Sequence, residues 1–102
     1  MNPESDNIQT ILDHIAEIVR REMEGNYRLF LFGSRASDGH DPKADIDIGI
    51  IAVKPDEAKI MVSIKERLEQ IPTLLKIDFV DFSMVSQEFR KIAMKEKKDI
   101  RI

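Results

Sequence analysis

The chain has 102 residues, 42% of them hydrophobic and 34% charged, which is typical of a folded globular protein that forms one domain. We therefore expect residues 1–102 to form a single domain around one core. The net charge of −3 argues against a dedicated nucleic-acid-binding protein, and the absence of cysteine excludes a disulfide scaffold, a thiol nucleophile and a cysteine-ligated zinc site.

The first predicted elements are a helix and a buried strand. Apolar residues recur at helical spacing over residues 6–24, where Ser5 or Asp6 can cap the helix and Gly25 can end it. Residues 27–32 are aromatic and apolar on both faces, as in a strand that is covered on two sides.

The middle of the chain predicts a loop, a strand, a helix and another strand. Residues 33–44 hold turn-forming side chains and predict a loop with one helical turn at its start. A second strand is expected over residues 45–53. A helix then begins near Pro55 and ends at Pro72, and a third strand covers residues 74–82.

The C-terminal segment predicts a last helix, capped by Ser83 or Ser86, and a charged tail over residues 95–102 that ends in a short edge strand. The order of elements is therefore α-β-β-α-β-α. This order predicts an α/β (α+β) protein in which helices cover a single mixed sheet. The most apolar run, residues 48–53, is too short to span a bilayer, and no signal-peptide pattern is present, so we expect a cytoplasmic protein with no membrane partner.

Gly33 and Ser34 directly follow the first predicted strand. A glycine allows the backbone to approach a ligand closely, and free N–H groups at the start of a helical turn attract phosphate. The Ser34 hydroxyl can add a further hydrogen bond. Taken alone, such a pair is more often an ordinary turn.

Asp45 and Asp47 open the second predicted strand and share one of its faces, with Cα atoms about 6.6 Å apart. Two neighbouring carboxylates repel each other unless a cation neutralises them, and hard oxygen ligands suit Mg²⁺ or Mn²⁺. An isolated pair of this kind is more often a solvated strand start.

The third predicted strand offers two further carboxylates, Asp78 and Asp81. The preceding helix acts as a crossover, so the second and third strands should run parallel and begin at the same end of the sheet. Asp78 lies near that end, whereas Asp81 is about 10 Å further along and on the other face. We therefore select Asp78 as the partner of the first two carboxylates and give Asp81 a structural or interface role.

A tight antiparallel return between the first two strands brings Ser34 beside the carboxylates. A phosphate-binding turn next to an acidic metal site is what nucleotidyl transfer requires, because divalent metals neutralise the triphosphate and align the attack with the leaving pyrophosphate. One carboxylate can also act as a base toward the acceptor hydroxyl.

The spaced motifs resemble a known family. Leu-Phe-Gly-Ser-Arg-Ala at residues 31–36, a ten-residue spacer from Arg35 through Ala44, and Asp45-Ile46-Asp47 are similar to the Gly-Ser-x10-Asp-x-Asp signature of DNA polymerase β-like nucleotidyltransferases. Within them the chain is most similar to the minimal nucleotidyltransferases (MNT). Residues 77–82 match the strand that carries the third carboxylate, and residues 85–102 resemble the closing helix and strand.

The resemblance implies a polymerase β-like nucleotidyltransferase core. It implies that Asp45, Asp47 and Asp78 are catalytic and bind Mg²⁺ or Mn²⁺, and that Gly33 and Ser34 contact the triphosphate of ATP.

Two positions near this motif leave alternatives open. Arg35 is common in the family's motif, but a salt bridge within the loop is an equally good interpretation. Many members have Gly where Asp38 stands, and an acid there would weaken ATP binding.

Minimal members often pair with a small helical HEPN protein that resembles an RNase toxin. The resemblance therefore implies a Mg²⁺-dependent antitoxin that moves AMP from ATP onto a hydroxyl, a tyrosine, of a HEPN-type partner within a hetero-oligomer. Two alternatives stay open: an antitoxin that acts by binding alone and keeps a residual site, and a nucleotidyltransferase for a small compound such as an aminoglycoside. The second would need an acceptor pocket supplied by a partner or a dimer.

Overall fold

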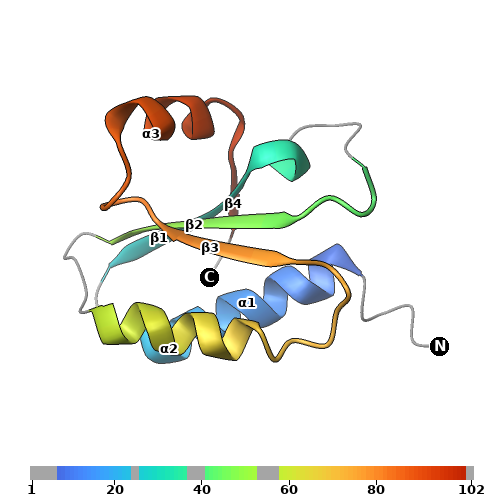
Figure 1. Ribbon diagram of the computed structural model, residues 1–102. Helices are drawn as coiled ribbons and strands as arrows, with labels where there is room; N and C mark the ends of the chain where they lie inside the picture. The colour runs from blue at the N-terminus through green and yellow to red at the C-terminus, as the bar shows by residue number, and fades with distance from the viewer. Residues whose placement is uncertain (1–6, 24–25, 37–40, 53–57, 101–102) are drawn as a thin grey trace.

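A four-stranded sheet with helices on both faces forms the structure, which is a computed structural model (Figure 1). It describes residues 7–23, 26–36, 41–52 and 58–100. Two helices lie below the sheet in this view, and a third helix and a short 3-10 turn lie above it. The predicted mixed sheet flanked by helices is confirmed.

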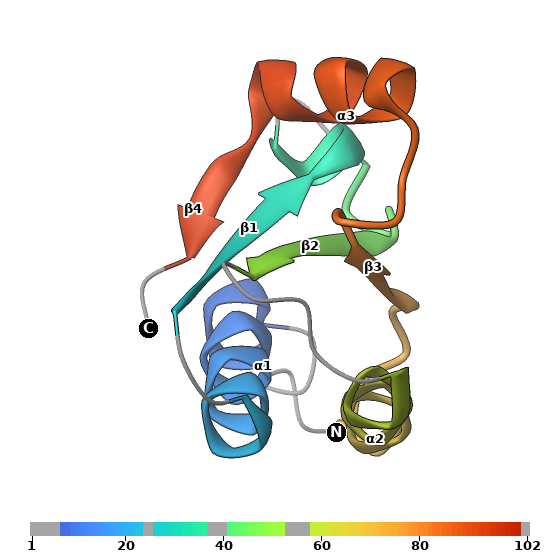
Figure 2. The same ribbon diagram turned by 90° about the vertical axis from the view of Figure 1, so that its left-hand side faces the viewer.

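The strand order is β3-β2-β1-β4. The central strand β1 (Tyr27–Phe32) pairs antiparallel with both β2 (Ile46–Ala52) and the short β4 (Lys98–Ile100). β2 pairs in parallel with β3 (Ile77–Asp81), as the crossover rule predicts. Figure 2 shows β3 and β4 at the two edges of the sheet, with the C-terminus beyond β4.

The two strands that carry the candidate carboxylates are shorter than the sequence predicts. Strand β2 begins at Ile46, so Asp45 is the residue before the strand and not its first member. Strand β3 covers Ile77–Asp81 and not residues 74–82, because residues 69–76 form turns and bends that bring the chain back from the preceding helix. Residues 53–57, which include the expected helix start at Pro55, lie outside the described residues.

Helix α1 (Ile8–Glu22) begins at a different cap from the one predicted. Asn7 is the N-cap, and its side-chain oxygen accepts a hydrogen bond from the Thr10 backbone N–H at 3.2 Å. Ser5, Asp6 and Gly25 lie outside the described residues, so neither the alternative caps nor the predicted stop can be placed. The buried side of the helix carries an apolar stripe along its length. Its members are Ile11, Ile15, Ala16 and Val19.

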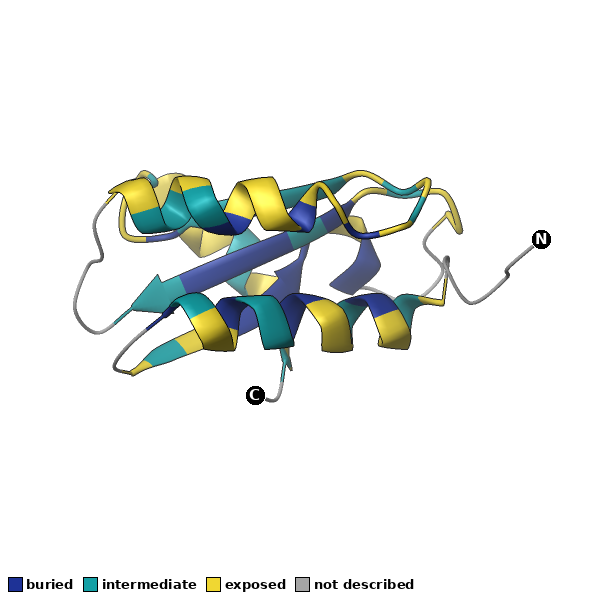
Figure 3. Ribbon diagram, turned by 90° about the horizontal axis from the view of Figure 1, so that it is seen from below, coloured by how far each residue is buried: buried dark blue, intermediate teal, exposed yellow. Residues whose placement is uncertain are grey.

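Helix α2 (Ala58–Leu68) ends four residues before Pro72, so the proline does not terminate it as predicted. Glu22 of α1 accepts hydrogen bonds from the Ser63 hydroxyl and, at 3.0 Å, from the Arg67 Nε of α2. This contact ties the two helices side by side under the sheet, and their outward faces are exposed (Figure 3).

The alternation of side chains along the strands divides the core between the two faces. The lower face holds apolar side chains that pack against α1 and α2. From the strands these are Leu29, Leu31, Ile46, Ile48, Ile50 and Phe79. The upper face holds Phe30, Phe32 and Phe82, with the rings of Phe30 and Phe82 edge to face at 4.8 Å. Gly49 makes room for these rings, because a Cβ there would overlap the side chain of Phe30.

Helix α3 (Gln87–Ala93) covers the upper face and is capped by Ser86, whose hydroxyl accepts from the Phe89 N–H at 3.1 Å. This confirms one of the two predicted caps. A 3-10 turn, η3 (Met94–Glu96), leads from α3 into β4, so the predicted edge strand is also confirmed. None of the described helices is both long enough and apolar enough to cross a bilayer.

Candidate active site

The parallel register of β2 and β3 places Asp47 level with Asp78 on neighbouring strands. Both side chains point to the upper face, because Ile46, Ile48 and Phe79 point into the apolar core below. The sheet therefore brings together two of the three carboxylates that the sequence singled out.

Burial is the largest of the effects that raise the pKa of Asp47 to about 6. The negative charges of Asp78 and Asp45 raise it further, and Lys76 acts in the opposite direction. The charges of Asp45 and Asp78 therefore both act at the Asp47 carboxyl. A divalent cation placed there would relieve the repulsion among them.

The three carboxylates are not drawn together into one tight group. Within the described ranges no three acidic, histidine or cysteine side chains are grouped closely enough to hold a metal ion as they stand. Asp45 is exposed and Asp78 is half-exposed. The donor set, all carboxylate oxygen, is the one that Mg²⁺ and Mn²⁺ prefer.

Asp78 and Asp81 have different surroundings, as their faces predicted. The Lys76 Nζ lies 3.7 Å from the Asp78 carboxylate, on the same side of the sheet. Asp81 is level with Ile50 and accepts hydrogen bonds from the backbone N–H and hydroxyl of Ser83, at 3.0 and 2.7 Å. Asp81 thus holds the turn after β3, away from Asp47.

Gly33 and Ser34 begin a 3-10 turn, η2 (Gly33–Ala36), directly after β1. Gly33 has a φ of 73°, a conformation that favours glycine. A Cβ at this position would overlap the Asp47 carboxylate, so the Gly33 backbone lies directly against it. Ser34 is exposed beside it. The predicted phosphate-binding turn and the carboxylates therefore adjoin.

Arg35 is buried, with 3% of its surface exposed. Its Nε donates to the Ala44 carbonyl at 2.8 Å, and one Nη donates to the Pro42 carbonyl at 2.7 Å. These bonds hold the chain that leads into Asp45. Residues 37–40, which include Asp38, lie outside the described residues.

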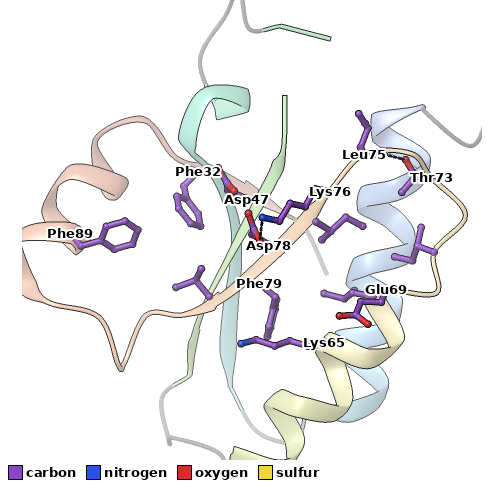
Figure 4. A pocket seen from close by; sticks show the side chains of 14 residues that line it. Phe32, Asp47, Lys65, Glu69, Thr73, Leu75, Lys76, Asp78, Phe79 and Phe89 are labelled. Atoms are coloured by element: carbon purple, nitrogen blue, oxygen red, sulfur yellow. Dashed lines mark hydrogen bonds and ion pairs between the residues drawn. The ribbon is translucent and has the colours of Figure 1, made fainter. Parts of the chain in front are cut away.

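A cavity of about 720 Å³ adjoins the carboxylates, and Figure 4 shows its lining. Asp47, Asp78 and Phe32 line it from the sheet, and Phe89 reaches it from α3. Lys76 also lines it. Sequence reasoning missed Lys76 and Phe89 as cavity residues. The alternation of the strand could have placed Lys76 on the face of Asp78, but nothing local indicated where Phe89 would point.

Comparison with known proteins agrees with this geometry. A family described as "Polymerase beta, Nucleotidyltransferase" matches residues 7–101. A curated relative from Haemophilus influenzae (strain ATCC 51907 / DSM 11121 / KW20 / Rd), named "Probable protein adenylyltransferase MntA", is 25% identical over 81 residues, which are 79% of this chain and 71% of the relative.

Solved structures share the fold. One is a complex of a tri-AMPylated Shewanella oneidensis HEPN toxin with an MNT antitoxin, with a TM-score of 0.69 and 19% identity, covering 91% of this chain and 71% of the other. Another is a toxin–antitoxin structure with AMP-PNP, with a TM-score of 0.71 and 19% identity, covering 88% and 72%. Since the family match spans residues 7–101, this chain belongs to the polymerase beta nucleotidyltransferase family.

Proposed function

We propose that this chain transfers AMP from ATP to a tyrosine hydroxyl of a HEPN-type toxin and thereby acts as its antitoxin. The observation that carries the proposal is the meeting of Asp47 and Asp78 on one sheet face, against Gly33 and within the influence of Asp45. The similarity to a protein named as an adenylyltransferase, and to a complex that contains an AMPylated toxin, supports a protein acceptor.

Asp45, Asp47 and Asp78 would hold Mg²⁺ or Mn²⁺, since their mutual repulsion and all-oxygen chemistry suit a hard cation. When bound, the metal neutralises charge on the triphosphate and makes the acceptor hydroxyl more acidic. Lys76 is the cation that already offsets the negative charge of this cluster.

Gly33 and Ser34 would bind the phosphates of ATP. The backbone N–H groups of this turn and the exposed Ser34 hydroxyl are hydrogen-bond donors next to the carboxylates. Arg35 acts indirectly, because it anchors the segment that leads into Asp45.

The reaction exchanges one bond for another. The acceptor oxygen forms a bond to the α-phosphorus of ATP, and the bond from that phosphorus to the oxygen bridging to the β-phosphate breaks. Pyrophosphate leaves with the electron pair of the broken bond. The hydroxyl proton passes to a carboxylate of the cluster, which acts as the general base.

The test is to purify the chain with the product of the adjacent reading frame, add ATP and Mg²⁺, and determine the intact mass of both proteins. The expected result is a gain of AMP on the partner that is lost in the Asp45→Asn/Asp47→Asn variant. A complex that silences the partner without any mass gain would instead indicate an antitoxin that acts by binding. AMP on a small alcohol, with no complex, would indicate a small-molecule enzyme.

A further inference from the structure

Strand β3 is an edge of the sheet, and it carries the candidate catalytic residue Asp78. In the part of the chain that the structure describes, β2 is the strand that pairs with it, and no strand covers its other side. Edge strands display free backbone groups that can pair with another chain. Here that open edge lies at the active site itself, and not at a distance from it.

The hydrogen bonds between β2 and β3 show which backbone groups face outward. The Lys76 carbonyl accepts from Ile46 of β2, and the Phe82 N–H donates to the Ile50 carbonyl of β2. The N–H and C=O groups of one strand residue point to the same side, and the side alternates along the strand. The even-numbered residues therefore face β2. The N–H and C=O groups of Ile77, Phe79 and Asp81 face away from the sheet.

The space beside this edge is the cavity of about 720 Å³ already described. Four consecutive residues of β3 line it, together with the end of α2 and the turn before β3 (Figure 4). Those four are Ile77, Asp78, Phe79 and Val80. The same cavity reaches Asp47 on β2. A polypeptide segment bound along this edge would therefore lie next to the carboxylates.

We propose that the acceptor segment of the partner binds in extended form along the free edge of β3 as a fifth strand, with its acceptor side chain opposite Asp78. This inference rests on the proposed function, because it assigns how that function's protein substrate is held. The occupant is a stretch of polypeptide with a hydroxyl side chain, recognised through its backbone.

The geometry of an added antiparallel strand favours Asp78 as the position opposite the acceptor. Ile77 and Phe79 would form the hydrogen-bonded pairs, which leaves Asp78 in the pair between them, where opposed side chains come closest. The side chain opposite Asp78 would also lie on the upper face, with the carboxylates. A tyrosine there would lie one strand spacing of about 4.8 Å from Asp78, on the face that also carries Asp47 one strand further away.

Amide hydrogen exchange, followed residue by residue by NMR, tests the pairing without any mutation. The labelled chain would be mixed with the HEPN-type product of the adjacent reading frame and with α,β-methylene-ATP, whose α–β bridge cannot be cleaved. The expected result is slower exchange at Ile77, Phe79 and Asp81. The N–H groups of Asp78 and Val80 face β2 and should change little.

Two matched substitutions at position 77 distinguish the contribution of the backbone N–H to partner binding from that of the side chain. Ile77→Pro removes an outward N–H, whereas Ile77→Ala keeps it and removes most of the side chain. We expect Ile77→Pro to raise the KM for the partner about tenfold more than Ile77→Ala does. The exchange measurement decides the question on its own if Ile77→Pro does not fold.

The outcomes separate this inference from the proposed function. Transfer of AMP to the partner with unchanged exchange at the three outward amides would overturn edge pairing and keep the transferase. Protection of those amides with no AMP ever found on the partner would keep the docking mode and overturn the proposed function. A mixture that shows neither a complex nor transfer would overturn both.

Discussion

The backbone of Gly33 lies so close to the Asp47 carboxylate that a side chain at position 33 would overlap it. The glycine also has a positive φ of 73°. The turn after β1 and the carboxylate on β2 are therefore in direct contact, which places the candidate phosphate-binding turn next to a candidate metal ligand.

Gly33→Ala should both destabilise the fold and reduce AMP transfer. The left-handed backbone costs an L-residue about 1–2 kcal/mol, and the new methyl group must push Asp47 out of place. Urea unfolding and transfer assays measure the two effects. In an Asp47→Ala background, Gly33→Ala should lower the free energy of unfolding by less, since the overlapping carboxylate is gone. An equal loss of stability in both backgrounds would show that the contact with Asp47 is unimportant.

Asp47→Asn should stabilise the metal-free protein at pH 7.5 by about 1 kcal/mol, after allowance for partial exposure. The folded-state pKa of Asp47, about 6, lies above its ordinary value of 3.8, so the folded protein loses stability as pH rises through this range. The advantage of the variant should disappear below pH 4. Unfolding in EDTA at pH 7.5 and pH 4 checks this, with the exposed Asp13→Asn as a control that stays within about 0.5 kcal/mol.

Metal affinity should fall as the solution becomes more acidic than pH 6. The raised pKa of Asp47 means that a proton must leave this carboxyl before it can act as a ligand. We expect Mn²⁺ binding, measured by calorimetry, to weaken by up to about tenfold per pH unit between pH 6 and pH 5. Affinity that stays constant over this interval would remove Asp47 from the ligand set.

Asp78→Ala should abolish transfer, whereas Asp81→Ala should keep turnover within a few-fold. Asp78 is level with Asp47, while Asp81 accepts hydrogen bonds from Ser83 in the turn after β3. Losing those bonds should cost Asp81→Ala about 1 kcal/mol of stability. Turnover with excess partner and thermal unfolding measure both properties, and inactivity of Asp81→Ala alone would refute the assignment.

Arg35→Met should lower stability by about 2–3 kcal/mol and transfer by at least tenfold. The substitution leaves the carbonyls of Pro42 and Ala44 without these donors and releases the segment before Asp45. Arg28→Met is the matched control, because Arg28 forms an exposed 3.4 Å ion pair with Asp99 that contributes little. Equal losses in the two variants would show that the Arg35 contacts have no special role.

The helices, the strands and the parallel crossover could be predicted from the sequence because they follow local rules. Because side chains alternate along a strand, Asp47 is expected on the sheet face opposite Ile46 and Ile48, and the structure places it there. The helical crossover makes β3 parallel to β2, and that direction places Asp78 rather than Asp81 beside Asp47. The predicted boundaries and N-cap of α1 are less accurate, because neighbouring polar residues compete for the same backbone donors.

The tertiary structure alone decided what the loops and the long side chains do. Arg35 is buried and donates to the carbonyls of Pro42 and Ala44, which only the folded loop brings within reach. Phe89 enters the cavity because α3 crosses above the sheet, a placement that depends on packing against Phe32 and Phe82. These contacts depend on how the loop closes and on where α3 packs, and no local periodicity encodes them.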